Sequence, residues 1–190
     1  MAKEKKSSEK EEGKKNKKKL IVTIVLLVVF IPALVTQVLW FLGPGRITQK
    51  NAIKDYFKAV GKEDVELLKD VSYPKKWQKH YKPNGQEMDL DSVIESSFMY
   101  QSGASFSKLK IVSDEDLSGE TAKAFQRGIE DIYGVELDVS AVSRVTFRMH
   151  VELPSGESQD TGDMVRYLYK VSGKWYFLSD TLLQVHLDLD

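Results

Sequence analysis

A run of 23 residues without a charged side chain, Leu20 to Leu42, constrains this chain more than any other feature of its sequence. Seventeen of the 23 are Leu, Ile, Val or Phe, and no face of the run is polar. A helix of that length, rising about 1.5 Å per residue, is roughly 34 Å long and can cross a hydrocarbon core of about 30 Å. The sequence therefore predicts a transmembrane helix over residues 20–42, kinked near Pro32.

Two other interpretations of this run remain open. A cleavable signal peptide also starts with a basic segment, but its apolar part usually has about 7–15 residues and ends at a small-x-small site. Here the apolar run is longer, and Gly43-Pro44-Gly45 follows it. The second alternative is a buried helix of a globular core. The lack of any polar face argues against it. We favour a retained anchor with a single pass through the membrane.

The formal net charge of zero conceals an uneven distribution of charge. Residues 1–19 hold nine Lys and four Glu, a net of +5, so residues 43–190 hold the other 19 basic and 24 acidic side chains, a net of −5. The positive-inside rule places the lysine-rich end of a span in the cytoplasm. We therefore expect a disordered cytoplasmic tail over 1–19, a span in the cell membrane and an extracellular C-terminal domain. The tail lysines act mainly as topology determinants, although they could also attract acidic lipids or nucleic acid.

After a short linker at 43–47, the spacing of apolar residues changes once along the chain. Helical spacing comes first and predicts helices over 48–60, 65–71, 74–81 and 89–98, the first of them interrupted at Gly61. Strand spacing then dominates: it predicts strands over 106–112, 144–153, 165–171 and 174–179, with an acidic turn at 113–116, a helix from Ser118 to Gly134, and further alternation over 183–189. This order predicts an α+β domain over 48–190, with helices packed on a curved antiparallel sheet.

Several of these segments carry a family resemblance. The first helix contains an A-I-x-x-Y-F pattern at 52–57, and the last hairpin reads V-S-G-K-W-Y-F-L at 171–178. With helices placed before strands, these motifs resemble the nuclear-transport-factor-two-like superfamily, which is also described as cystatin-like or ketosteroid-isomerase-like. The segment 132–135 leading into 142–151 looks like membrane-anchored extracytoplasmic members of that group in Gram-positive bacteria. The resemblance spans about residues 48–180 and implies a cone-like domain, but not one activity, because the superfamily includes isomerases, dehydratases and partner-positioning modules.

A cone of this kind could enclose an apolar ligand pocket. The residues that would line it are Tyr56, Phe57, Phe98, Met149, Tyr167, Tyr169 and Trp175. Aromatic residues at helix and strand spacing more often fill a core, and that interpretation is favoured here. No catalytic residue is predicted, because His150 and Glu152 alternate away from the apolar face of their strand.

The sequence also argues against metal and thiol chemistry. It has no cysteine, which excludes disulfides, zinc knuckles and thiol nucleophiles. His150 with Glu152, and His186 with Asp188, could each place two ligands on one strand face. Such pairs are common on solvated strands, so neither a metal nor a cofactor is expected.

One segment combines aromatic and basic side chains in a way that suits an interaction surface. It contains Lys75, Lys76, Trp77, Lys79, Tyr81 and Lys82. Nucleic acid is excluded as its partner by the expected extracellular position, which leaves an anionic wall polymer, a lipid headgroup or an acidic protein. The competing interpretation is a helix that lays Trp77 on the core while its lysines stay in water.

These observations predict a membrane-anchored extracytoplasmic module that binds or positions another envelope component and is not an enzyme. It could form a homodimer through the open face of its sheet. The alternative is a small-molecule-binding or enzymatic cone domain, of isomerase or dehydratase type, held at the membrane. A cavity above about 300 Å³ that contains a buried ionisable group would favour the alternative.

Overall fold

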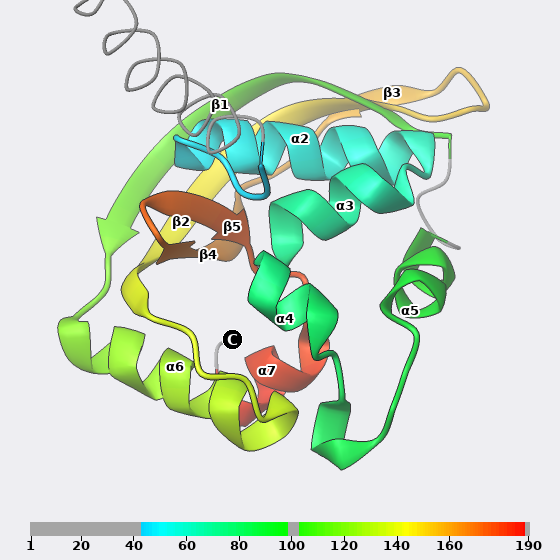
Figure 1. Ribbon diagram of the computed structural model, residues 1–190. Helices are drawn as coiled ribbons and strands as arrows, with labels where there is room; N and C mark the ends of the chain where they lie inside the picture. Colours follow the sequence, from blue (N-terminus) through cyan, green and yellow to red (C-terminus); the bar gives the residue numbers. More distant parts are fainter. Residues whose placement is uncertain (1–42, 99–102, 189–190) are drawn as a thin grey trace, which may run out of the picture. The chain divides into compact units, whose positions relative to one another are not determined.

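The computed structural model describes residues 43–98 and 103–188, and from Pro44 onward these belong to one compact unit (Figure 1). Within the described ranges, no helix combines the length and the apolar surface that crossing a membrane requires. The predicted cytoplasmic tail and transmembrane helix, residues 1–42, lie outside those ranges.

Helices come before strands in the described residues, apart from one helix between the first two strands and a last short helix. In chain order the elements are α2 (Gln49–Lys62), α3 (Val65–Ser72), α4 (Lys75–Lys79), the 3-10 helix η1 (Pro83–Gly85), α5 (Leu90–Ser97), β1 (Ser105–Asp116), α6 (Gly119–Tyr133), β2 (Val139–Glu152), β3 (Ser158–Asp160), β4 (Met164–Val171), β5 (Lys174–Phe177) and α7 (Thr181–His186). The predicted α+β class is confirmed.

Side-chain caps determine where the longer helices begin. Thr48 and Asp64 each accept a hydrogen bond from a backbone N–H in the first turn of α2 and α3. Asp89 and Ser118 do the same for α5 and α6. Each cap of this type contributes about 1 kcal/mol to stability. At the other end of α6, Gly134 adopts the left-handed conformation with φ 65° and ends the helix, as the sequence predicted.

Gly61 does not interrupt the first helix, contrary to the prediction from sequence. Helix α2 continues to Lys62 and ends where Glu63 takes a left-handed conformation. A Cβ atom at position 61 would lie 2.1 Å from the carbonyl oxygen of Ala104. The glycine therefore allows the backbone in front of β1 to approach the helix closely, and it is not a helix stop.

The sheet is antiparallel throughout and curls around one helix. Its strand order is β1-β2-β4-β5, with β3 paired to the end of β2. Helix α2 contacts both β1 and β5, the two ends of this order, which requires the sheet between them to curl strongly into a half-barrel (Figure 1). Irregular pairing between Ser107 and Lys110 on β1 adds a local bend. The predicted packing of helices on a curved antiparallel sheet is confirmed.

The side chains on each face of the sheet belong to a separate apolar cluster. On the face towards α2, Phe147 of β2 packs against Phe57 with 5.8 Å between ring centroids. On the opposite face, Val142 of β2 lies directly across from Tyr169 of β4, and both join a larger cluster. That cluster includes buried side chains of α3, α4, α5, α6 and α7, so the short helices depend on the sheet for their packing.

Part of the predicted linker, 43–47, is docked on the sheet. Arg46 exchanges two backbone hydrogen bonds with Trp175 of β5, at 2.8 and 2.7 Å, and its guanidinium pairs with Asp55 of α2. Gly45 has φ 78°, and a Cβ atom there would lie 2.6 Å from the ring of Tyr176. These contacts cover the outer edge of β5, which would otherwise offer unpaired backbone groups.

The acidic segment 113–116 extends β1, where the sequence predicted a turn. Its backbone pairs with residues 143–146 of β2. Asp114 accepts a hydrogen bond from the hydroxyl of Ser143 at 2.6 Å, and Glu115 forms an ion pair with Arg144. Long-range partners therefore override a local composition that is typical of turns.

The predicted alternation over 183–189 gives way to helix α7, which ends at His186. Asp180 caps this helix, and Leu183 is fully buried. Leu183 packs closely against Gly128 of α6. A Cβ atom added at Gly128 would lie only 2.9 Å from Leu183 Cδ1. Because the segment is helical, His186 and Asp188 do not share a strand face.

Candidate functional site

A pocket of about 290 Å³ is lined by α2, α3, α5, the start of α7 and the segments that follow α3 and α4. Its polar wall includes Tyr56, Tyr73, Tyr81, Ser97 and Asp180. Among the described residues that line it, only Asp180 is charged. We refer to this cavity as the Asp180 pocket.

Asp180 is buried, with 6% of its surface exposed. Its Oδ1 atom accepts the backbone N–H of Leu183 at 2.9 Å and so caps α7. Its Oδ2 atom accepts the hydroxyl of Tyr133 at 2.6 Å and, at 3.5 Å, that of Tyr81. Within the described part of the chain no lysine, arginine or histidine pairs with this carboxylate. Buried charges are usually paired with an opposite charge, so burying this carboxylate without a basic partner costs free energy.

Burial and the charge of Asp180 keep the neighbouring tyrosines neutral. Burial, and then the carboxylate, raise the pKa of Tyr81 to about 12. The same two causes, in the same order, raise the pKa values of Tyr73 and Tyr133. All three hydroxyls therefore remain protonated at neutral pH and can donate hydrogen bonds. The site thus combines neutral donors with one group that only accepts.

Contacts between aromatic rings hold the pocket wall in place. The ring of Tyr73 meets those of Trp77 and Tyr81 edge to face, with centroids 5.1 and 5.9 Å away. Trp77 and Tyr81 also contact Tyr133, at 4.9 and 5.2 Å. Trp77 is fully buried, and its Nε1 atom has no hydrogen-bond partner among the described residues. Packing on several sides restricts these rings, so the wall of the pocket is largely preformed.

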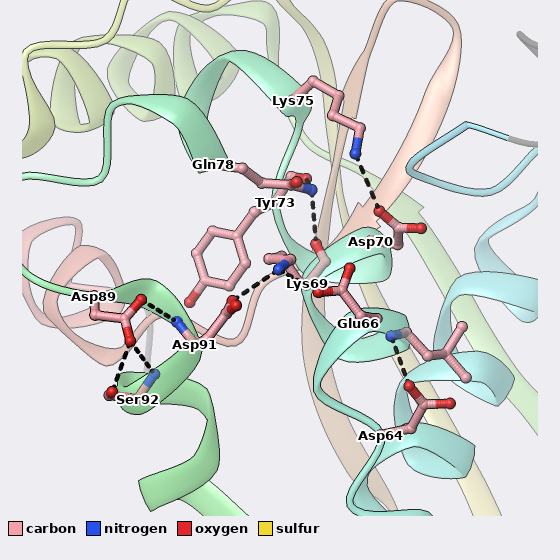
Figure 2. Close-up of polar contacts among 11 residues, drawn as sticks. Asp64, Glu66, Lys69, Asp70, Tyr73, Lys75, Gln78, Asp89, Asp91 and Ser92 are labelled. Carbon is pink, nitrogen blue, oxygen red and sulfur yellow. Dashed lines mark hydrogen bonds and ion pairs between the residues drawn. The ribbon is translucent and has the colours of Figure 1, made fainter.

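A second, more open hollow of about 620 Å³ adjoins the pocket and contains several lysines. Figure 2 shows how acidic residues neutralise part of their charge. Lys69 reaches Asp91 at 2.8 Å, and Lys75 lies 4.0 Å from Asp70. The hollow is therefore of mixed charge, and its positive potential is weaker than its number of lysines suggests.

The predicted aromatic and basic patch divides between the surface and the core. Trp77 and Tyr81 are buried, in line with the competing interpretation of that segment. Lys76 donates to the backbone oxygen of Glu136 at 2.6 Å. The rings of Trp77 and Tyr81 thus contribute to the core, while Lys75, Lys79, Tyr81 and Lys82 line the more open hollow together.

The seven residues that the sequence assigned to a pocket do not surround one cavity. Only Tyr56 among them lines the Asp180 pocket. Four are buried within the apolar clusters: Phe57, Phe98, Met149 and Tyr169. Tyr167 and Trp175 are partly exposed, and the Nζ atom of Lys170 lies 5.4 Å from the centroid of the Trp175 ring.

No group of three or more potential metal ligands occurs within residues 43–98 and 103–188. His150, which the sequence paired with Glu152, contacts Asp160 of β3 at 2.7 Å instead. This pair is at the surface, where Asp160 is exposed.

Sequence reasoning did not identify Asp180 or Tyr133 as functional candidates. The sequence Ser179-Asp180-Thr181 before two leucines is a usable signal for a helix cap. No local signal joins Asp180 to Tyr133, because the two lie 47 positions apart.

Comparisons of the chain with protein-family models, curated proteins and solved structures found no match. The functional argument therefore depends on the chemistry of the Asp180 pocket.

Proposed function

We propose that the protein is a membrane-anchored extracytoplasmic binding module whose ligand site is the Asp180 pocket. The observation that carries the proposal is a preformed cavity of about 290 Å³ whose wall contains one buried carboxylate with no basic partner among the described residues. A binding site of this kind needs a few well-placed polar groups in an otherwise apolar cavity. The uncharged run at 20–42 and the lysines before it support the anchor and its orientation.

The nuclear-transport-factor-two-like fold remains part of this proposal. It is supported by the order of helices before strands and by the curled antiparallel sheet. An envelope protein or anionic wall polymer remains a proposed partner for the exposed lysines. The acidic residues beside Lys69 and Lys75 make the small-molecule pocket the better-supported site.

An enzymatic role of isomerase or dehydratase type has one observation in its favour, which is the contact of Tyr81 and Tyr133 with Asp180. Both carboxylate oxygens already accept hydrogen bonds, one of them in the cap of α7. The carboxylate is thus engaged in contacts within the fold through both oxygens, which favours a role in holding a ligand over one in removing a proton.

Ligand-observed NMR with the full-length protein in dodecyl maltoside micelles tests the pocket. The probes are choline, its neutral isostere 3,3-dimethylbutan-1-ol, and 3,3-dimethylbutanoate. At least one should bind, and Ser97→Trp should abolish that binding because Ser97 is exposed and lines the pocket. Ser158→Trp on the exposed strand β3 is the matched control and should bind normally. No binding by any probe, or binding that survives Ser97→Trp, would overturn the proposed site.

The proposed orientation has a separate test. Protease added to whole cells that make the protein should degrade the C-terminal domain, and lysed cells provide the control for protease activity. Protection of the domain in whole cells would contradict its extracellular position.

A further inference from the structure

The geometry points to a small organic ammonium ion as the ligand class of the Asp180 pocket. This inference rests on the proposed function, because it assigns chemistry to the same cavity. It is carried by three features of the described residues: the charge balance of the lining, the aromatic wall and two exposed apolar side chains.

The charge balance of the lining favours a cation. Asp180 accepts hydrogen bonds from one backbone N–H and two tyrosine hydroxyls, and none of these donors carries a positive charge. No basic side chain of the described residues lines the cavity, although lysines surround the neighbouring hollow. A positively charged ligand would supply the missing partner of a buried charge, whereas an anion would be repelled by it.

The aromatic wall is the second feature. Tyr56, Tyr73 and Tyr81 all line the pocket, on the same cavity as the carboxylate. Aromatic faces attract cations through the negative charge of their π-systems, and the attraction is strongest where water is excluded. Quaternary and alkylated ammonium groups are weakly hydrated, so they lose little on leaving water for such a site.

Two large apolar side chains are among the exposed residues that line the pocket, beside Ser96, Ser97 and Thr181. Met88 and Leu182 both line it and are 47% and 48% exposed. Exposed large apolar side chains beside a cavity offer contact surface to the methyl or alkyl groups of a ligand. Together with a volume of about 290 Å³, this surface suits an ammonium ion with a few carbon atoms and one hydroxyl or similar polar group.

The test compares choline with 3,3-dimethylbutan-1-ol, which has the same shape and no charge. In titrations of the full-length protein in dodecyl maltoside, choline should bind about tenfold more tightly than the isostere. Asp180→Asn retains an oxygen that can cap α7 and removes the charge. This variant should weaken choline binding about tenfold and leave the isostere unchanged. Asp131→Asn, a change of the same charge at an exposed site on α6, should leave both unchanged.

A second variant protects the test against a folding defect in Asp180→Asn. Thr181 is exposed and lines the pocket beside the carboxylate. Thr181→Lys places a positive charge there without removing the cap, so it should abolish choline binding and preserve binding of the isostere.

The possible outcomes separate the two proposals. Equal affinities for choline and its isostere, or choline binding that is unaffected by both Asp180→Asn and Thr181→Lys, would overturn the ammonium inference and leave the pocket in place. Failure of all three probes, including the anionic 3,3-dimethylbutanoate, would overturn the pocket itself.

Discussion

Removing the hydroxyl of Tyr133 tests whether the buried carboxylate depends on its hydrogen bonds. Tyr133 is 3% exposed and donates to Asp180 Oδ2 at 2.6 Å, while the only other donor to that oxygen among the described residues, Tyr81, is 3.5 Å away. A hydrogen bond to a charged group contributes about 1.5–3 kcal/mol, and losing it leaves a buried acceptor poorly satisfied. Tyr133→Phe should therefore lower the free energy of unfolding by about 2 kcal/mol. For a domain of this size, that corresponds to a fall of roughly 4–8 °C in Tm.

Thermal unfolding of the full-length protein in micelles, followed by tryptophan fluorescence, measures this effect. Trp77 is a suitable reporter because its ring lies 4.9 Å from that of Tyr133. Tyr176→Phe is the matched control: its hydroxyl donates to the neutral carbonyl of Pro44 at 3.1 Å. That variant should lose only about 0.5–1.5 kcal/mol. A loss for Tyr133→Phe that is no greater than the loss for Tyr176→Phe would refute the view that Asp180 is a buried charge held by hydrogen bonds.

Three further predictions concern stability. Gly128→Ala should lower Tm because its Cβ would lie 2.9 Å from the side chain of buried Leu183, even though alanine is more favourable than glycine in a helix by about 1 kcal/mol. Gly119→Ala is the control on the same helix: position 119 faces open space, so Tm should stay unchanged or rise. Because the pKa of Tyr81 is about 12 when folded and about 10 when unfolded, the unfolded chain releases its proton first, so stability should fall as pH rises from about 10 to 12. Tyr81→Phe should reduce this loss of stability at high pH. Thermal melts over the pH range measure the stability, and tyrosinate absorbance measures the ionisation of the tyrosines. Arg148→Ala breaks only an exposed ion pair and should leave Tm within error of the parent.

The fold class was predictable because most of its elements follow local rules. Asp89 and Ser118 were in cap positions, Gly134 in a stop position, and the strand around Val145 showed a clear alternation. The errors arose where distant partners decide the outcome. Segment 113–116 has the composition of a turn, but its pairing with β2 makes it a strand. The close approach of Ala104 to Gly61 is likewise invisible until the chain is folded.

The site was less predictable, because its residues meet only through tertiary packing. The period-two spacing after Leu183 suggested a strand, and α7 depends on the space that Gly128 leaves on α6. Unless that helix is predicted, nothing in the sequence indicates that Asp180 lies beside Tyr133. A predicted cap would therefore have identified a helix start, but it would not have shown a buried charge or a pocket.

Capping alone does not account for the aspartate at position 180. Asparagine caps helices about as well as aspartate does, and it carries no charge that is costly to bury. The carboxylate is 6% exposed and has no basic partner among the described residues, so its charge adds a cost that the cap does not require. A bound ammonium ion would offset that cost, and Asp180→Asn separates the two roles. If the cap were the whole explanation, the variant would be at least as stable as the parent and would bind choline equally well.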